Sequence, residues 1–304
     1  LEQGAGYLPL TFEEFNEIMC SLDIGEPGKV AIGVSGGSDS MALSFLLNDW
    51  CIATDIELVA LTVDHGLRET STKEATQVAK WFLDENIEHH ILTWRGDKPE
   101  SNIQNAARNA RYELMGSWCA ANDITHLFLA HHQDDQAETF LIRLFRGSGV
   151  DGLSGMRRIA SLPLPDTRFD MPHLYRPLLN IPKKRLTENL KLDDRNWIDD
   201  PSNENTNFAR VNVRNLIGTS NIDGLNSQRI SLTAERLNRV RGFLEDATSN
   251  ADSLYVVYHK LGYAVLDAVF FEKLHEEISL RLLSLILKKI ADKKYRVYLG
   301  PFDN

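Results

Sequence analysis

Six residues that lie between an apolar run and a helical pattern, Ser-Gly-Gly-Ser-Asp-Ser at 35–40, carry the groups needed to hold a phosphate. The paired glycines let backbone N–H groups turn inward without an obstructing Cβ, and the start of the following helix adds partial positive charge. Asp39 would repel a bare phosphate unless a cation lay between them, which indicates Mg²⁺. A Gly-Ser turn that merely begins the helix is the alternative, but the apolar strand before the loop and the position of Asp39 favour the phosphate site. The predicted nucleotide-binding residues of this loop are Ser35, Gly36, Gly37, Ser38, Asp39 and Ser40.

A second set of polar side chains stands where other apolar runs end. Asp64 and His65 end the run 57–65, and His131 and His132 end the run 126–132. In a parallel sheet the carboxyl ends of the strands share one edge, so these residues are expected near the loop at 35–40.

A helix predicted to begin near Gln133 carries three carboxylates. Asp134 and Asp135 lie four and three positions before Glu138, so one face of that helix is acidic. We hypothesise that Asp39 and Asp135 hold Mg²⁺ against phosphate groups. A zinc site is disfavoured because no second cluster of His or Cys completes a tetrahedral ligand set.

The pattern around these residues predicts an α/β protein with a doubly wound parallel sheet. Apolar, β-rich runs at 29–35, 57–65, 88–94 and 126–132 are expected to be strands buried on both faces, and helical patterns at 38–50, 71–86 and 101–123 separate them. Ligands of such sheets bind at the carboxyl ends of the strands, where the polar residues described above fall.

The residue composition and the hydrophobic pattern of the chain change near residue 150. The stretch 161–177 is rich in Pro and is expected to be a loop, and long helical patterns follow from about 227 around a predicted hairpin at 254–267. We therefore expect a second, smaller and mainly helical C-terminal domain. The predicted division is a catalytic domain at 1–217, a linker at 218–226 and the C-terminal domain at 227–304.

Composition is that of an ordinary soluble protein. The 304 residues are 43% hydrophobic and 25% charged, and no apolar run approaches the length of a membrane span. The N-terminus has no signal-peptide pattern, and the three cysteines are far apart, so a cytoplasmic protein without a membrane partner is expected. The net charge of −10 does not by itself suggest a nucleic-acid partner, but local basic patches decide such binding.

The loop at 35–40 is neither G-x-x-x-x-G-K-[ST] nor G-x-G-x-x-G. It resembles the signature Ser-Gly-Gly-x-Asp-Ser of the pyrophosphate-loop ATPases. The resemblance implies an adenine nucleotide alpha hydrolase-like fold, and an enzyme that cleaves ATP between the α and β phosphates, adenylates an oxygen of its substrate and releases pyrophosphate.

Further motifs narrow the resemblance to the tRNA(Ile)-lysidine synthetase family. They are VDHGLR at 63–68, NAARNARYELM at 105–115, AHHQDDQAE at 130–138, RPLL at 176–179 and the segment 199–215. The resemblance implies a ligase that adenylates carbon-2 of the wobble cytidine in tRNA(Ile) with a CAU anticodon. Free L-lysine then displaces AMP to form lysidine.

The same resemblance implies roles for individual residues. His131 is expected at the α-phosphate or adenylate, and Arg111 and Arg108 are expected to stabilise negative charge, although both arginines could instead be solvated or paired with Glu113 or Asp123. A carboxylate of the acidic helix is expected to hold the lysine ammonium or to accept its proton. The predicted catalytic residues are Asp39, Arg111, His131, Asp135 and Glu138, and Asp64 and His65 join the nucleotide site. The predicted tRNA-facing residues are Arg108, Arg176, Asn203, Asn207, Arg210 and Arg214, with Lys183, Lys184 and Arg185 as a further basic surface.

Three other functions remain open at the level of sequence. A thiolation-type enzyme acting on tRNA and an amide-forming ligase share the loop, but paired cysteines and a glutaminase segment are not evident. A nucleotide- or RNA-binding protein without catalysis would not need to keep Asp39, Asp135 and Glu138. The sequence also leaves the oligomeric state open and allows a homodimer.

Overall fold

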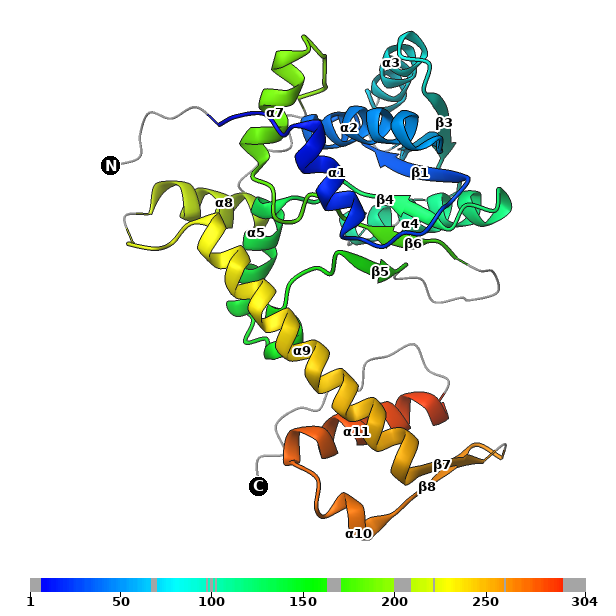
Figure 1. Cartoon of the computed structure of the whole chain (residues 1–304), viewed down its shortest axis with the longest axis vertical. Helices are drawn as coiled ribbons and strands as arrows, with labels where there is room; N and C mark the ends of the chain where they lie inside the picture. The colour runs from blue at the N-terminus through cyan, green and yellow to red at the C-terminus, as the bar shows by residue number, and fades with distance from the viewer. Residues whose placement is uncertain are drawn as a thin grey trace.

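The computed structural model describes residues 7–66, 70–96, 98, 101, 103–162, 171–199, 209–220, 222–259 and 261–291. Within these ranges no helix is both long enough and apolar enough to cross a membrane. Figure 1 shows a sheet with flanking helices in the N-terminal two-thirds and a smaller unit, built around the end of a long helix, at the C-terminal end.

A six-stranded sheet forms the centre of the larger part, in the order β3-β2-β1-β4-β6-β5. The first five strands in that order are parallel, and β5 is antiparallel to β6. This arrangement confirms the predicted α/β class with a mainly parallel sheet. The strands are β1 Lys29–Val34, β2 Glu57–Asp64, β3 Glu88–Thr93, β4 His126–Phe128, β5 Ile159–Ser161 and β6 His173–Tyr175.

The strand order changes direction beside β1. From β1 the chain builds outward to β2 and β3, and it then returns to the other side of β1 to form β4, with Ile32 in register with both Ala60 and Phe128. Such a switch point leaves a crevice at the carboxyl ends of the two neighbouring strands. The loop at 35–40 leaves β1 there, and the segment 129–135 leaves β4.

Helices cover both faces of the sheet because side chains of β1 alternate between them. Ile32 packs in a core with α2 (Ser38–Thr54), α3 (Ser71–Asp84) and α7 (Lys183–Leu192), whereas Ala31 packs in a second core with α4 (Ile103–Ala121). β1 and β2 are buried on both faces as predicted. β3 is not: it is an edge strand with exposed and half-buried positions throughout, and its Glu88 reaches Lys29 of β1 at 2.6 Å.

Several elements were not predicted. The helices α1 (Phe12–Cys20) and α7 had no predicted counterpart, and β6 lies inside the stretch expected to be a loop. β5 and β6 are three residues each, too short to produce a recognisable alternation. Their pairing therefore depends on the neighbouring strand β4 and not on a local pattern.

The C-terminal third is mainly helical, as predicted. After α5 (Gln133–Leu144), α6 (Val150–Leu153) and α8 (Ala209–Thr219), the helix α9 runs from Ser227 to Tyr255. A hairpin follows as expected, and its strands are β7 (Val256–His259) and β8 (Tyr263–Leu266); α10 (Ala268–Phe271) and α11 (Glu276–Ala291) complete the described chain.

The long helix α9 belongs to both parts of the molecule. Its first turns pack on α5 through Ile230 and Ala234, beside Ala137 and Phe140, and its last turns pack against the hairpin and α11 through Ala251. Figure 1 shows α9 (yellow) leading away from the sheet to the hairpin and α11. α9 thus connects the two parts, and an ion pair of 3.0 Å between Arg281 of α11 and Asp151 of α6 also joins them.

Candidate functional site

Hydrogen bonds of a serine hydroxyl group fix the conformation of the loop at 35–40. Ser40 Oγ accepts a hydrogen bond from Ser35 N at 3.2 Å and donates one to Gly37 O at 3.0 Å. Gly37 is the N-cap of α2 and has no side chain to accept from the first turn, which leaves those N–H groups for an anion. The loop therefore has the donors that the sequence predicted for a phosphate.

Gly36 is required by its conformation and by its surroundings. Its φ is +84°, and a Cβ there would lie 2.9 Å from side-chain atoms of both Ile198 and Val78. Its carbonyl oxygen accepts a hydrogen bond from Ile198 N at 2.9 Å. The segment before residue 200 thus packs directly on the loop.

Asp39 faces a lysine and a histidine side chain. Its Oδ2 lies 3.1 Å from Lys183 Nζ and 3.4 Å from Nε2 of His132. Burial alone would raise the pKa of Asp39, but the hydrogen bond and charge of His132 and the charge of Lys183 lower it to about 2. Asp39 is therefore ionised at neutral pH.

The imidazole of His132 joins Asp39 to the acidic start of α5. His132 is 3% exposed, and its Nε2 also lies 3.5 Å from Oδ2 of Asp135. Asp135 in turn accepts a hydrogen bond from His132 N at 3.1 Å. Burial would lower the pKa of His132, but the hydrogen bond to Asp39 and the surrounding carboxylates raise it. The predicted metal pair, Asp39 and Asp135, is thus brought to one nitrogen atom.

Asp134 points toward α7. Its Oδ2 accepts a hydrogen bond from Lys183 N at 3.0 Å. In the described part of the chain no three His, Cys, Asp or Glu side chains are arranged as a metal site. Two carboxylates completed by phosphate oxygens and water are the usual way to hold Mg²⁺, so Asp39 and Asp135 fit that ion without a full protein cage.

Glu138 is 1% exposed, and its two oxygens differ. Oε1 accepts a hydrogen bond of 2.7 Å from Nε of Arg214, whereas Oε2 is buried with no hydrogen-bond partner among the described residues. Burial raises the pKa of Glu138, although Arg214 opposes that shift. One carboxylate oxygen of Glu138 is therefore left without a hydrogen-bond partner among the described residues.

His131 lies among arginines. Its Nδ1 is buried without a hydrogen-bond partner among the described residues, and burial together with the charges of Arg176 and Arg108 holds its pKa well below the ordinary value. Arg176 is 6% exposed and donates Nη1 to the carbonyl of Arg157, and Arg108 donates to the hydroxyl of Tyr112 at 3.0 Å. A neutral imidazole surrounded by guanidinium groups suits an anion such as a phosphate.

Asp64 ends β2, the neighbour of β1 in the sheet, and His65 follows it. Asp64 accepts hydrogen bonds from the hydroxyls of Ser71 and Thr72, each at 2.6 Å, so in this conformation its oxygens support the start of α3. His65 Nε2 lies 3.3 Å from Nη2 of Arg111. Direct contact of Asp64 with a nucleotide stays a prediction.

The remaining predicted residues are only partly described. Arg210 and Arg214 lie one turn apart on α8, and Arg210 is exposed. Asn203 and Asn207 lie outside the described residues.

The sequence did not predict a role for His132 or a site contact for Lys183. A His-His doublet before an acidic helix was the available signal for His132. Lys183 was assigned to a basic surface with Lys184 and Arg185. Arg185 instead donates to the carbonyls of Leu8 and Pro9 and pairs with Glu14, so it holds the N-terminal segment.

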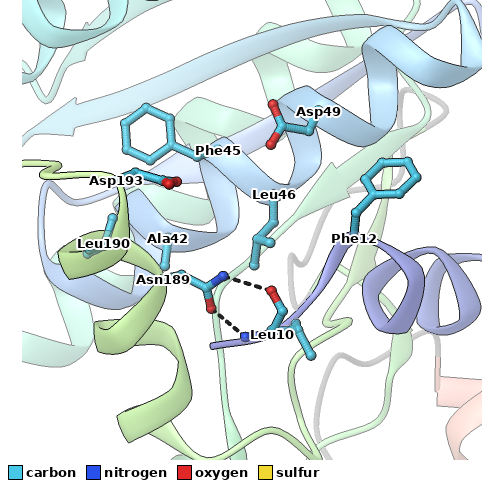
Figure 2. A pocket seen from close by; sticks show the side chains of 9 residues that line it. All are labelled: Leu10, Phe12, Ala42, Phe45, Leu46, Asp49, Asn189, Leu190 and Asp193. Atoms are coloured by element: carbon cyan, nitrogen blue, oxygen red, sulfur yellow. Dashed lines mark hydrogen bonds between the residues drawn. The ribbon is translucent and has the colours of Figure 1, made fainter. Parts of the chain in front are cut away.

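A cavity of about 110 Å³ lies elsewhere, between the start of α1, α2 and α7. Figure 2 shows Asn189 at this cavity, where its side chain makes two hydrogen bonds to the backbone of Leu10. The lining of this cavity includes no residue of the loop at 35–40 or of the acidic start of α5. The candidate site is therefore the group of polar side chains at the carboxyl edge of the sheet, which this cavity does not include.

Comparisons with known proteins identify the family of the chain. A model of the PP-loop domain matches residues 12–220. A tRNA(Ile)-lysidine synthase from Wolbachia pipientis is 41% identical over 270 residues, which are 88% of this chain and 61% of that protein. The chain spans about three fifths of the length of that relative.

A tRNA(Ile)-lysidine synthase from Bradyrhizobium diazoefficiens is 35% identical over 283 residues, 90% of this chain and 76% of that protein. Among solved structures, a U34-tRNA thiolase from Methanococcus maripaludis, described with its [4Fe-4S] cluster, superimposes with a TM-score of 0.61. It is 20% identical, with 75% of this chain and 79% of that chain covered, so it supports the fold alone. By the matches to the domain model and to the synthases, this chain belongs to the PP-loop family of tRNA(Ile)-lysidine synthases.

Proposed function

We propose that this protein uses ATP to convert the wobble cytidine of tRNA(Ile) with a CAU anticodon into lysidine. One observation carries the proposal: oxygens of Asp39 and Asp135 meet at Nε2 of His132, and one turn after Asp135 on α5 the Oε2 of Glu138 is buried with no hydrogen-bond partner among the described residues. A phosphate loop, a pair of carboxylates and a third carboxylate with an available oxygen are what adenylation followed by amine attack requires.

In the first step, the carbonyl oxygen on carbon-2 of the cytidine attacks the α-phosphorus of ATP. The bond from that phosphorus to the bridging oxygen breaks, and pyrophosphate leaves. The loop at 35–40 would hold the phosphates through backbone N–H and serine hydroxyl groups. His131, neutral and surrounded by Arg176 and Arg108, is the proposed contact of the α-phosphate.

Asp39 and Asp135 would hold Mg²⁺, which when bound would neutralise phosphate charge. The low pKa of Asp39, about 2, keeps that carboxylate ionised for this role. Arg111 would stabilise the charge that develops as AMP forms and leaves.

In the second step, an amino group of free L-lysine attacks carbon-2, the carbon–oxygen bond to AMP breaks, and the amine loses a proton. Glu138 is the proposed acceptor of that proton, or the partner of the lysine ammonium, because Oε2 is the oxygen left without a partner. Burial raises the pKa of Glu138, which makes its carboxylate a stronger proton acceptor than an exposed one.

The tRNA would be held by arginines around the crevice and on α8. We assign Arg108, Arg176, Arg210 and Arg214 to this role, together with Asn203 and Asn207. We also propose the division into a catalytic domain at 1–217, a linker at 218–226 and a C-terminal domain at 227–304, a cytoplasmic location, and a homodimer that light scattering would test.

A thiolation reaction that depends on an iron–sulfur cluster is disfavoured by the cysteines. Cys20, Cys51 and Cys119 lie on three different helices, and burial raises the pKa of Cys51 and Cys119 to about 12. Such a cluster needs several thiolates within one site, which these positions do not provide.

The test is incubation with Mg-ATP, radiolabelled lysine and unmodified tRNA(Ile) of CAU anticodon. The expected result is label retained on the RNA, lost when ATP is omitted or when the wobble cytidine is replaced by uridine. Release of AMP and pyrophosphate without retained label would indicate another reaction of the PP-loop class. No consumption of ATP with any substrate would indicate a binding protein.

A further inference from the structure

Lys183 is the first residue of α7, and its backbone and side chain contact two different parts of the site. Its N–H donates to Asp134 Oδ2 at 3.0 Å, which anchors the start of α7 to the start of α5. Its Nζ reaches Asp39 Oδ2 at 3.1 Å, and the side chain is 41% exposed. The ammonium group therefore stands at the phosphate loop and is open to solvent on one side.

We propose that Lys183 is the lysine that binds the β- and γ-phosphates of ATP, and the pyrophosphate released from them. The inference rests on the proposed function, because it assumes that ATP is the substrate of this site. It assigns to Lys183 a task that a lysine within the loop performs in the P-loop NTPases.

The loop at 35–40 has no positive side chain to balance the charge of a triphosphate, so a cationic residue from elsewhere in the chain is needed. Residues 35–40 contain no cationic side chain and one carboxylate, whereas the triphosphate carries several negative charges. Lysine suits this position because its ammonium is a compact charge with three donors on a flexible stem. α7 places that charge at the loop from 144 positions further along the chain.

Two other basic side chains near the site, His132 and Arg214, already have partners. His132 also contacts Asp39, but it is 3% exposed and is held between Asp39 and Asp135. Arg214 pairs with Glu138. Lys183 is the half-exposed partner of Asp39, so its ammonium can turn to an incoming phosphate by rotation of its own side chain.

The ion pair between Asp39 and Lys183 would change when a cation and phosphates bind. With no cation on Asp39, the carboxylate and the ammonium neutralise each other at 3.1 Å. A cation held by Asp39 would repel the ammonium, while phosphate oxygens on the same ligand would accept its hydrogen bonds. The ion pair in this structure thus keeps the lysine beside the place where the phosphates would bind.

The test is direct binding of pyrophosphate, ATP and AMP to the full chain by calorimetry in the presence of Mg²⁺. Lys183→Ala is expected to weaken binding of pyrophosphate and ATP by about tenfold or more while AMP binding stays the same. Lys183→Arg should restore part of the loss, and Lys183→Gln should not.

Lys191→Ala is the matched control. Lys191 lies on the same helix, is 57% exposed and pairs only with Glu188 among the described residues, so its removal changes the charge of α7 equally. It is expected to leave all three affinities unchanged.

Unchanged affinity of Lys183→Ala for pyrophosphate would overturn the inference, and so would an equal loss of pyrophosphate and AMP binding, since that would mean a structural role. If Lys183→Ala does not fold, Lys183→Gln and Lys183→Arg give the same comparison. A wild-type chain that binds neither ATP nor pyrophosphate would overturn the proposed function and this inference together.

Discussion

Nε of Arg214, on α8, donates a hydrogen bond of 2.7 Å to Oε1 of Glu138, on α5, although the two residues are 76 positions apart. Glu138 is almost completely buried, and the Arg214 side chain is 45% exposed. The pair therefore joins the segment assigned to tRNA binding to the acidic helix of the site.

Replacement of Arg214 by Ala should lower the free energy of unfolding by about 1–3 kcal/mol, because a buried carboxyl loses its partner. The double variant Arg214→Ala/Glu138→Gln should be less destabilised than the two single effects added together. Urea unfolding of all four proteins measures this coupling. Simple additivity would show that the hydrogen bond does not contribute to stability.

Asp39→Asn should keep the fold and lose at least about 100-fold in lysidine formation, because the amide cannot hold a cation as a carboxylate does. Circular dichroism and the labelled-lysine assay measure the two properties. Asp246→Asn, at an exposed position on α9, is the control and should retain activity. Normal turnover by Asp39→Asn at ordinary Mg²⁺ would exclude Asp39 as a metal ligand.

Gly36→Ala should abolish ATP binding and destabilise the fold, because a Cβ at this position meets Ile198 and Val78 at 2.9 Å. Gly25 offers a matched control: its φ is also positive, at +69°, but nothing lies within 4 Å of an added Cβ. Gly25→Ala should show only the cost of the left-handed backbone, about 1–2 kcal/mol. Equal effects of the two substitutions in thermal unfolding and in ATP titration would contradict the role of the close contact.

Stability should fall as pH decreases from about 6.5 to about 4, in part because of His89. Burial, and then the charge of His90, lower the pKa of His89 from 6.5 to about 4, so in this window the unfolded chain binds a proton that the folded chain does not. The contribution is present above pH 6.5 and is lost as pH falls through that range. Since His89 is only half-buried, we expect about 1–2 kcal/mol. His89→Gln should flatten this part of the pH profile of urea unfolding, and an unchanged slope would refute the assignment.

The sequence was most informative where a local pattern and a chemical requirement coincide. The apolar run before residue 35, the two glycines and Asp39 predicted a strand, a loop and a helix, and β1 and α2 have these bounds within a few residues. The acidic face at Asp135 and Glu138 was predicted from helical spacing in the same way.

The unpredicted features depend on contacts between distant segments. Lys183 meets Asp39 only because α7 packs on α2, and nothing in the sequence around Lys183 distinguishes it from Lys184. The three-residue strand β6 exists because β4 lies beside it. Exposure of β3 follows from its place at the edge of the sheet, which its own residues do not specify.

The 29 residues of α9 form a rod about 43 Å long, fixed at one end to the helix that carries Asp135 and Glu138. Such a rod is a lever arm: a tilt of about 5° where Ile230 meets α5 would move the far end, about 37 Å away, by about 3 Å. Small repacking at α5 would therefore be magnified at the β7–β8 hairpin. Conversely, a macromolecule that binds the hairpin and displaces it would shift the packing between α9 and α5, the helix that carries Asp135 and Glu138.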